Sequence, residues 1–252
     1  MTPTDHDTVP SALVTGASRG IGLGIARRLA ERGYGLTITA RSEDALAEVA
    51  QTLRADGAPE VLTVAGDLSD PGHPPALVAA HRDRFSVLHG LVLNAGVGTA
   101  GRIEDYPDRR FTRSVEVNLR APMTLIQQSL PLLRAGAAAA PATGAKVIAL
   151  SSITGVYPEA GLAVYGATKA ALLSLIDTLN AEEAAGGVVA TSLAPAYVDT
   201  DMSAWVHDRI GPEEMIPVGD IVELVDTLLR LSPRSVVGRM VVTRAAGSAF
   251  QA

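Results

Sequence analysis

Short apolar runs alternate with longer amphipathic stretches along almost the whole chain. Seven runs are rich in β-branched and other apolar residues: 11–16 (SALVTG), 35–40 (GLTITA), 60–67, 86–96, 145–152, 187–195 (GVVATSLAP) and 238–244. This alternation is typical of βαβ units, in which helices cover both faces of a parallel sheet. We therefore expect an α/β fold with a doubly wound parallel sheet of about seven strands.

The pattern predicts one domain and no interdomain linker. Two long helices are expected over about 108–134 and 162–185, and the alanine-rich stretch 134–145 between the first of them and the next strand reads as a surface loop. A single Rossmann-like domain then spans 11–252, after a polar tail at 1–10 that we expect to be disordered. Ligands of such sheets bind outside the carboxyl ends of the strands, so functional residues are sought there.

Composition limits the classes of partner that the chain can bind. The 252 residues carry a net charge of −6 and no cluster of Lys or Arg, which disfavours nucleic acid and anionic membranes as partners. No apolar run reaches the ~18 residues of a spanning helix. The absence of cysteine excludes disulfides and thiolate chemistry and fits a reducing cytoplasm, and the five His lack ligand-like spacing, so we expect no metal. A small-molecule substrate is the partner that remains.

A glycine turn follows the first predicted strand. The segment TGASRGIG at 15–22 has the spacing G-x-x-x-G-x-G, which permits a tight turn and close approach of a pyrophosphate to the amides of the next helix. An ordinary strand–helix corner is the alternative, but the position at the first βα junction favours a dinucleotide. The expected cofactor-binding residues of the turn are Gly16, Ser18, Arg19, Gly20, Ile21 and Gly22.

The end of the second strand favours NADP(H) over NAD(H). A carboxylate there would bind the ribose 2′-hydroxyl of NAD, whereas this chain has Ala40 followed by Arg41. Arg19 can reach the same region, and guanidinium groups bind phosphate in bidentate fashion. The alternative is that Arg41 is only a solvated surface residue.

Tyr165 and Lys169 form an unusual pair near the start of the second long helix. Residues four apart lie on one helix face, so the ammonium is expected within about 5 Å of the phenol. At that distance it would lower the tyrosine pKa from ~10 by about two, and an oxidised nicotinamide beside it would lower the pKa further. The pair then becomes a proton donor and acceptor near neutral pH.

Six motifs, taken in order, resemble the short-chain dehydrogenase/reductase family over about residues 11–244. They are TGASRGIG (15–22), LNAG (93–96), VNL (117–119), SSITG (151–155), YGATK (165–169) and APAYVDT (194–200). The resemblance implies a catalytic tetrad of Asn118, Ser152, Tyr165 and Lys169. By it, Tyr165 transfers the proton, Ser152 orients the substrate oxygen, Lys169 lowers the tyrosine pKa and holds the ribose, and Asn118 holds a relay water.

The same resemblance implies further cofactor contacts. Asp67 would bind the adenine amino group with Leu68 beside it, although Asp67 could also be a helix-entry acid. The other implied contacts are Asn94, Ala95 and Gly96 on the adenosine ribose side, and Pro195, Val198 and Thr200 near the nicotinamide and phosphates. The family's usual Pro-Gly after the sixth strand is Pro195–Ala196 here.

The resemblance also implies that the segment 197–217 is a lid over the substrate, and we expect the pocket below it to be mainly apolar. The aromatic and sulfur side chains of this segment, together with those behind the serine, suggest the pocket residues Ile153, Thr154, Tyr157, Tyr197, Met202 and Trp205. Trp205 could instead anchor the lid onto the domain.

The favoured activity is hydride transfer between NADP(H) and a carbonyl or secondary alcohol, with reduction of a small or medium apolar ketone or aldehyde. A 3-oxoacyl-(acyl-carrier-protein) reductase is the alternative, and Arg134 and Lys146 keep it open, although the second long helix ends in acidic residues. A dinucleotide-binding sensor without turnover is the alternative from another class. A homo-oligomer, dimer or tetramer, is expected on family grounds through the two long helices.

Overall fold

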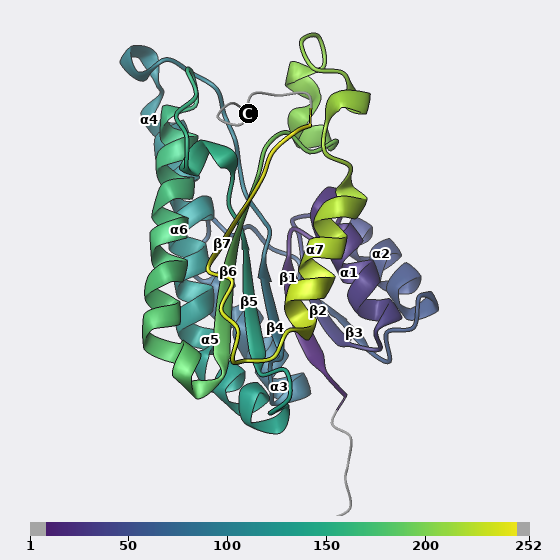
Figure 1. The fold of residues 1–252 in the computed structure, drawn as a ribbon. Helices are drawn as coiled ribbons and strands as arrows, with labels where there is room; N and C mark the ends of the chain where they lie inside the picture. The colour runs from purple at the N-terminus through teal and green to yellow at the C-terminus, as the bar shows by residue number, and fades with distance from the viewer. Residues whose placement is uncertain (1–8, 246–252) are drawn as a thin grey trace, which may run out of the picture.

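Seven parallel strands form the centre of the molecule, as the computed structural model shows for residues 9–245 (Figure 1). The sheet order is β3-β2-β1-β4-β5-β6-β7. The expected fold class is therefore confirmed, whereas most of the predicted 1–10 tail lies outside the described residues. The strands are β1 (Ser11–Thr15), β2 (Gly35–Thr39), β3 (Val61–Thr63), β4 (Gly90–Leu93), β5 (Ala145–Leu150), β6 (Val188–Pro195) and β7 (Arg239–Val242).

Helices cover both faces of this sheet. One layer contains α1 (Gly20–Glu31), α2 (Glu43–Ala55) and α7 (Val218–Arg230), and the other contains α3 (His73–Phe85), α5 (Ala121–Ala139) and α6 (Ala163–Glu183). Strand β1 contributes side chains to the hydrophobic cores on both faces of the sheet, because side chains alternate along a strand. Ala12 and Val14 pack with the first layer and Leu13 with the second, all fully buried. Such strands read as continuous apolar runs.

Two elements differ from the sequence-based prediction. Helix α7 was not predicted, although Ile221, Val225 and Leu228 repeat at helical spacing and are buried. The alanine-rich stretch predicted as a loop is helical as far as Ala139, because alanine favours a helix. Gly136 is required inside this helix, since a Cβ there would lie 2.2 Å from the carbonyl oxygen of Leu88.

The first long helix is interrupted by a π-helical turn. α4 (Asp108–Val115) leads into the turn at Glu116–Arg120, and α5 continues from Ala121. The NH of Ala121 bonds the carbonyl of Glu116, five residues earlier, which marks the wider turn. Asn118 lies inside this π-helical turn.

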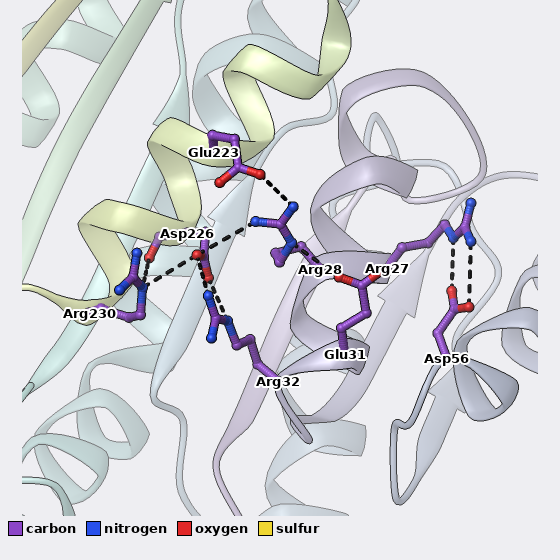
Figure 2. A network of polar contacts seen from close by, with 8 residues as sticks. All are labelled: Arg27, Arg28, Glu31, Arg32, Asp56, Glu223, Asp226 and Arg230. Carbon is purple, nitrogen blue, oxygen red and sulfur yellow. Dashed lines mark hydrogen bonds and ion pairs between the residues drawn. The ribbon is translucent and has the colours of Figure 1, made fainter.

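Three arginines, one in α1, one at its C-cap and one in α7, surround a buried carboxylate of α7 (Figure 2). Asp226 is 4% exposed and accepts two hydrogen bonds from Arg32, at 3.1 and 2.8 Å. Arg28 and Arg230 lie 3.6 and 3.3 Å from the same carboxylate. The network thus fixes α1, the helix that begins at the glycine turn, to α7.

The chain reverses its winding direction between β1 and β4, which are neighbours in the sheet. The crevice beyond the carboxyl ends of these strands is where doubly wound sheets bind ligands. The predicted lid contributes two short 3₁₀ helices there, Asp201–Val206 and Pro212–Glu214, which lie beyond the start of α7 (Figure 1). Among residues 9–245, no helix has the length and apolar character to cross a membrane.

Candidate active site

Three positions of the turn after β1 require glycine. Gly16 and Gly20 have φ of +67° and +55°, a conformation that glycine adopts without strain. A Cβ at Gly22 would lie 2.3 Å from the carbonyl oxygen of Gly16. Asn94 holds the turn from β4, as its Nδ2 donates to the carbonyls of Thr15 and Gly16 at 3.0 and 3.1 Å. The turn can therefore bring the amides of α1 close to a pyrophosphate.

Arg41 and Arg19 lie at the end of the cavity where a 2′-phosphate is expected. Both side chains line the cavity, and Arg41 is exposed just beyond the end of β2. Glu43 and Asp44 belong to the first turn of α2, which Ser42 caps by accepting a hydrogen bond from the NH of Ala45. These acidic residues thus stabilise α2 by interacting with the positive end of its dipole.

Arg19 is also joined to the lid. Its Nη1 lies 2.8 Å from a carboxylate oxygen of Asp201, and both side chains are largely exposed. The lid residue Thr200 is close to the turn as well, since a Cβ at Gly20 would lie 3.4 Å from its methyl group. Lid and glycine turn therefore meet at the cavity.

Asp67 is positioned by hydrogen bonds that the sequence did not indicate. Its Oδ1 accepts from the NH and hydroxyl of Ser69, and its Oδ2 accepts from Arg113 at 3.1 Å. The bond from the Ser69 NH, with smaller contributions from the Ser69 hydroxyl and Arg113, holds the pKa of Asp67 below its usual value despite burial. Arg113, on α4, also lines the cavity. It was missed because no local pattern links residues 46 positions apart.

Ser152 stands just past the end of β5 with its oxygen already engaged. Its Oγ accepts hydrogen bonds from the NH and the hydroxyl of Thr154, at 3.2 and 3.0 Å. The Ser152 proton is thereby left to be donated. The hydroxyl of the neighbouring Ser151 instead donates to the carbonyl of Lys169 at 3.0 Å, so it fixes the position of α6.

Tyr165 and Lys169 share one face of α6, as their spacing predicted. The Lys169 Nζ is 5.6 Å from the centroid of the Tyr165 ring and donates to the carbonyl of Leu150 at 2.7 Å. Burial lowers the pKa of Lys169 to about 8. Burial also raises the pKa of Tyr165 to about 12, although a hydrogen bond with Ser152 opposes the rise.

The expected lowering of the tyrosine pKa by the protein alone is therefore wrong. Desolvation of the phenolate is the larger cause, and the hydrogen bond with Ser152 opposes it; the Lys169 ammonium is itself desolvated and donates to the carbonyl of Leu150. A further positive charge beside the phenol is required to lower its pKa toward neutral pH.

Asn118 connects the π-helical turn to the loop after β4. Its Oδ1 accepts from the NH of Val97 and its Nδ2 donates to the carbonyl of Val97, both at 2.9 Å. Nδ2 also lies 3.1 Å from the hydroxyl of Thr168. Its side chain thus holds the loop over Lys169, and the relay water remains a prediction.

One cavity of about 910 Å³ brings nearly all of the predicted residues together. Gly22 and Asn118 support its wall from behind and do not line it. Tyr157 does not line it either and packs against the core of the first helical layer, because the 3₁₀ turn at Ile153–Gly155 directs the chain away. The predicted residues that line it are Gly16, Ser18, Arg19, Gly20, Ile21, Arg41, Asp67, Leu68, Asn94, Ala95, Gly96, Ser152, Ile153, Thr154, Tyr165, Lys169, Pro195, Tyr197, Val198, Thr200, Met202 and Trp205.

The lid presents aromatic side chains to the cavity, and the carboxylate of Glu159 lies against one of them. Tyr197 packs edge-on against Trp205 with ring centroids 6.0 Å apart. Trp205 is 53% exposed, so it is not a buried anchor of the lid. Glu159, which the sequence analysis missed, accepts a hydrogen bond from the Tyr197 hydroxyl at 2.9 Å. No cluster of side chains suited to a metal ion occurs within residues 9–245.

Comparisons with known proteins agree with this geometry. A family model described as short chain dehydrogenase matches residues 10–210. An uncharacterized oxidoreductase of Staphylococcus epidermidis is 33% identical over 192 residues, which cover 76% of this chain and 79% of the relative. The alcohol dehydrogenase from the archaeon Thermococcus sibiricus, solved with 5-hydroxy-NADP, superposes with a TM-score of 0.83 at 29% identity and covers 97% of this chain and 98% of its own.

A third similar protein was solved with NAD rather than an NADP derivative. The 3-oxoacyl-[acyl-carrier protein] reductase from Brucella melitensis, solved with NAD, also has a TM-score of 0.83, at 28% identity over 93% of this chain and 95% of its own. Since the family model covers most of the chain and the fold agrees throughout, this chain belongs to the short-chain dehydrogenase/reductase family of oxidoreductases.

Proposed function

We propose that this chain transfers a hydride between NADP(H) and a carbonyl or secondary alcohol, with Ser152, Tyr165 and Lys169 at the reaction centre. The observation that carries the proposal is that these three side chains line the same cavity as the glycine turn. A bound nicotinamide would supply or accept the hydride. The presence of all three side chains also disfavours a sensor without turnover, which would not need them.

The protein residues handle the substrate oxygen and its proton. The Ser152 hydroxyl can donate to that oxygen, because its own acceptor sites are taken by Thr154. Tyr165, with a pKa of about 12, is protonated at neutral pH and can give its proton to the oxygen during reduction. In the oxidative direction the positive charge of the nicotinamide would favour the phenolate, the charge that the protein alone does not supply.

NADP(H) is favoured as the cofactor by the residues at the end of β2. Thr39, Ala40 and Arg41 line the cavity there, so a guanidinium and no carboxylate occupies the strand end. The Thermococcus relative was solved with an NADP derivative and the Brucella relative with NAD, so relatives of this fold bind either nucleotide. The preference for NADP(H) here rests on Arg41 and Arg19.

A freely diffusing ketone or aldehyde is favoured over a carrier-bound substrate. The name of the Brucella relative raises the carrier-protein alternative. However, Arg134 forms an ion pair with Glu183, and Lys146 is 3% exposed with its Nζ bonded to the carbonyl of Thr143. The two cations considered for an acidic carrier are thus engaged within the chain. We expect the enzyme to act in the cytoplasm as a dimer or tetramer formed through α5 and α6.

The test is a panel of ketones, aldehydes and secondary alcohols, with the absorbance of the reduced nicotinamide followed with NADPH and NADH in parallel. Tyr165→Phe should reduce kcat by about a thousandfold or more while the Kd of NADPH changes by less than about threefold. An acetoacetyl thioester offered free and on a carrier protein separates the two substrate classes. Turnover by Tyr165→Phe at the wild-type rate would refute the proposed mechanism.

A further inference from the structure

The Glu159 carboxylate, on the loop between β5 and α6, has only one of its two oxygens hydrogen-bonded. The Tyr197 hydroxyl donates to Oε1 of Glu159 at 2.9 Å, whereas Oε2 is buried from solvent without a hydrogen-bond partner. Both residues line the cavity that contains Ser152 and Tyr165. The substrate side of the cavity therefore contains a negatively charged hydrogen-bond acceptor, in addition to the aromatic surface of Trp205.

An unpaired buried carboxylate oxygen is an unfavourable feature that a ligand can relieve. Buried polar atoms are nearly always paired, and one left unpaired loses the hydration that it had in water. The terminal torsion of a glutamate is soft and roughly two-fold, so rotation about it can present either oxygen to the cavity. A donor arriving with the substrate would supply the missing partner.

Tyr197 and Glu159 line the same cavity as Tyr165 and Ser152. Burial, followed by the hydrogen bond to Glu159 and the charge of that residue, raises the pKa of Tyr197. Tyr197 therefore stays protonated and continues to donate to Glu159. Its ring packs edge-on against Trp205, so the tyrosine is held from both ends and acts as a positioning residue for the carboxylate.

We infer that Glu159 is a specificity-determining residue, and that it selects carbonyl substrates bearing a hydrogen-bond donor, a hydroxyl or a protonated amine, apart from the carbonyl. The inference rests on the proposed reductase function and revises the expectation of a mainly apolar substrate. Apolar surface from Trp205 and Met202 would cover the body of such a substrate, and the carboxylate would bind its donor.

Three nearly isosteric ketones test the inference: para-ethyl-, para-(hydroxymethyl)- and para-(aminomethyl)acetophenone, each with its homologue one methylene longer. The wild-type enzyme should show a kcat/KM for one or both donor-bearing ketones at least about tenfold above that of the ethyl ketone, mainly through KM. The hydroxymethyl and aminomethyl compounds distinguish a neutral donor from a charged one. Equal kcat/KM across the series at both lengths would overturn the inference.

Variants assign the preference to the carboxylate. Glu159→Gln should lower the kcat/KM of the aminomethyl ketone relative to the ethyl ketone by about tenfold, and that of the hydroxymethyl ketone by less. Tyr197→Phe should raise KM for the donor-bearing ketones more than KM for the ethyl ketone. Asp208→Asn is the matched control, since it removes the same charge from an exposed lid position that does not line the cavity.

The outcomes separate the two proposals. If the ethyl ketone is reduced and Glu159→Gln retains the wild-type preference, the specificity inference fails while the proposed function stands. If no ketone of the series or the broader panel is turned over with either nucleotide, the proposed function fails, and the inference fails with it.

Discussion

Replacing Asp226 by Asn should destabilise the protein by roughly 2 kcal/mol. The side chain is 5% exposed and lies against Arg28, Arg32 and Arg230 (Figure 2). One such pair at about 4 Å gains ~4 kcal/mol at an effective dielectric of ~20, and the desolvation of the carboxylate cancels part of that gain. Removing the charge leaves the arginines, which are 26% to 57% exposed, to be partly rehydrated, so the loss stays below the ~3–5 kcal/mol of a fully buried pair.

Thermal and denaturant unfolding measure this loss. For a chain of this size, roughly 2 kcal/mol corresponds to a fall in Tm of about 4–8 °C. Glu223→Gln is the control, because it removes the same charge from the same helix at a side chain that is 62% exposed and contacts only Arg28. We expect a much smaller change in Tm for the control. A Tm of Asp226→Asn equal to that of Glu223→Gln would refute the reasoning.

The pH dependence gives the same prediction a second readout. Burial acts to raise the pKa of Asp226, but Arg32, Arg230 and Arg28 together outweigh burial and hold the pKa below its ordinary value. The stabilisation is then fully present above the ordinary aspartate pKa of ~4 and is lost as pH falls through the lower native value. The difference between wild type and Asp226→Asn should therefore shrink on acidification below pH ~4. A difference that grows in acid would contradict the assignment.

Three predictions concern the cofactor end and the reaction centre. Arg41→Ala should weaken NADPH binding by about ten- to a hundredfold and leave NADH nearly unchanged, as measured by fluorescence titration. Asp201→Asn should tighten NADPH by up to about fivefold, because it frees Arg19 from an exposed ion pair; weaker binding would contradict this. Since burial lowers the pKa of Lys169 to about 8, that residue loses its charge above this pH, and kcat/KM for NADPH should fall there; a flat profile between pH ~7 and ~10 would contradict the role of its charge.

The elements that the sequence predicted best are those in which local pattern and function coincide. The glycine turn and the Tyr165–Lys169 pair follow from spacing within single segments, whereas Ser152 follows from the family resemblance; the parallel sheet brings all of them to one cavity. Helix α7 could have been predicted as well, because its apolar positions repeat at helical spacing.

Other features depend on contacts that no local pattern records. Arg113 meets Asp67 across 46 positions of the chain, and the Tyr197–Glu159 bond joins the lid to the loop after β5. The predicted direction of the tyrosine pKa shift was wrong for a related reason. The spacing places Lys169 beside Tyr165, but the desolvation that raises the pKa depends on everything packed around the phenol.

The π-helical turn also determines how this region can vary. A π turn accommodates one extra residue, which offsets the angular phase of α4 from that of α5 by about 100° relative to an uninterrupted helix. That offset helps α4 to aim Arg113 at the cavity while α5 keeps its leucines on the sheet. Deleting a single residue here would rotate α4 about its axis relative to α5. Such a deletion would therefore turn Arg113 away from the cavity together with the other side chains of α4.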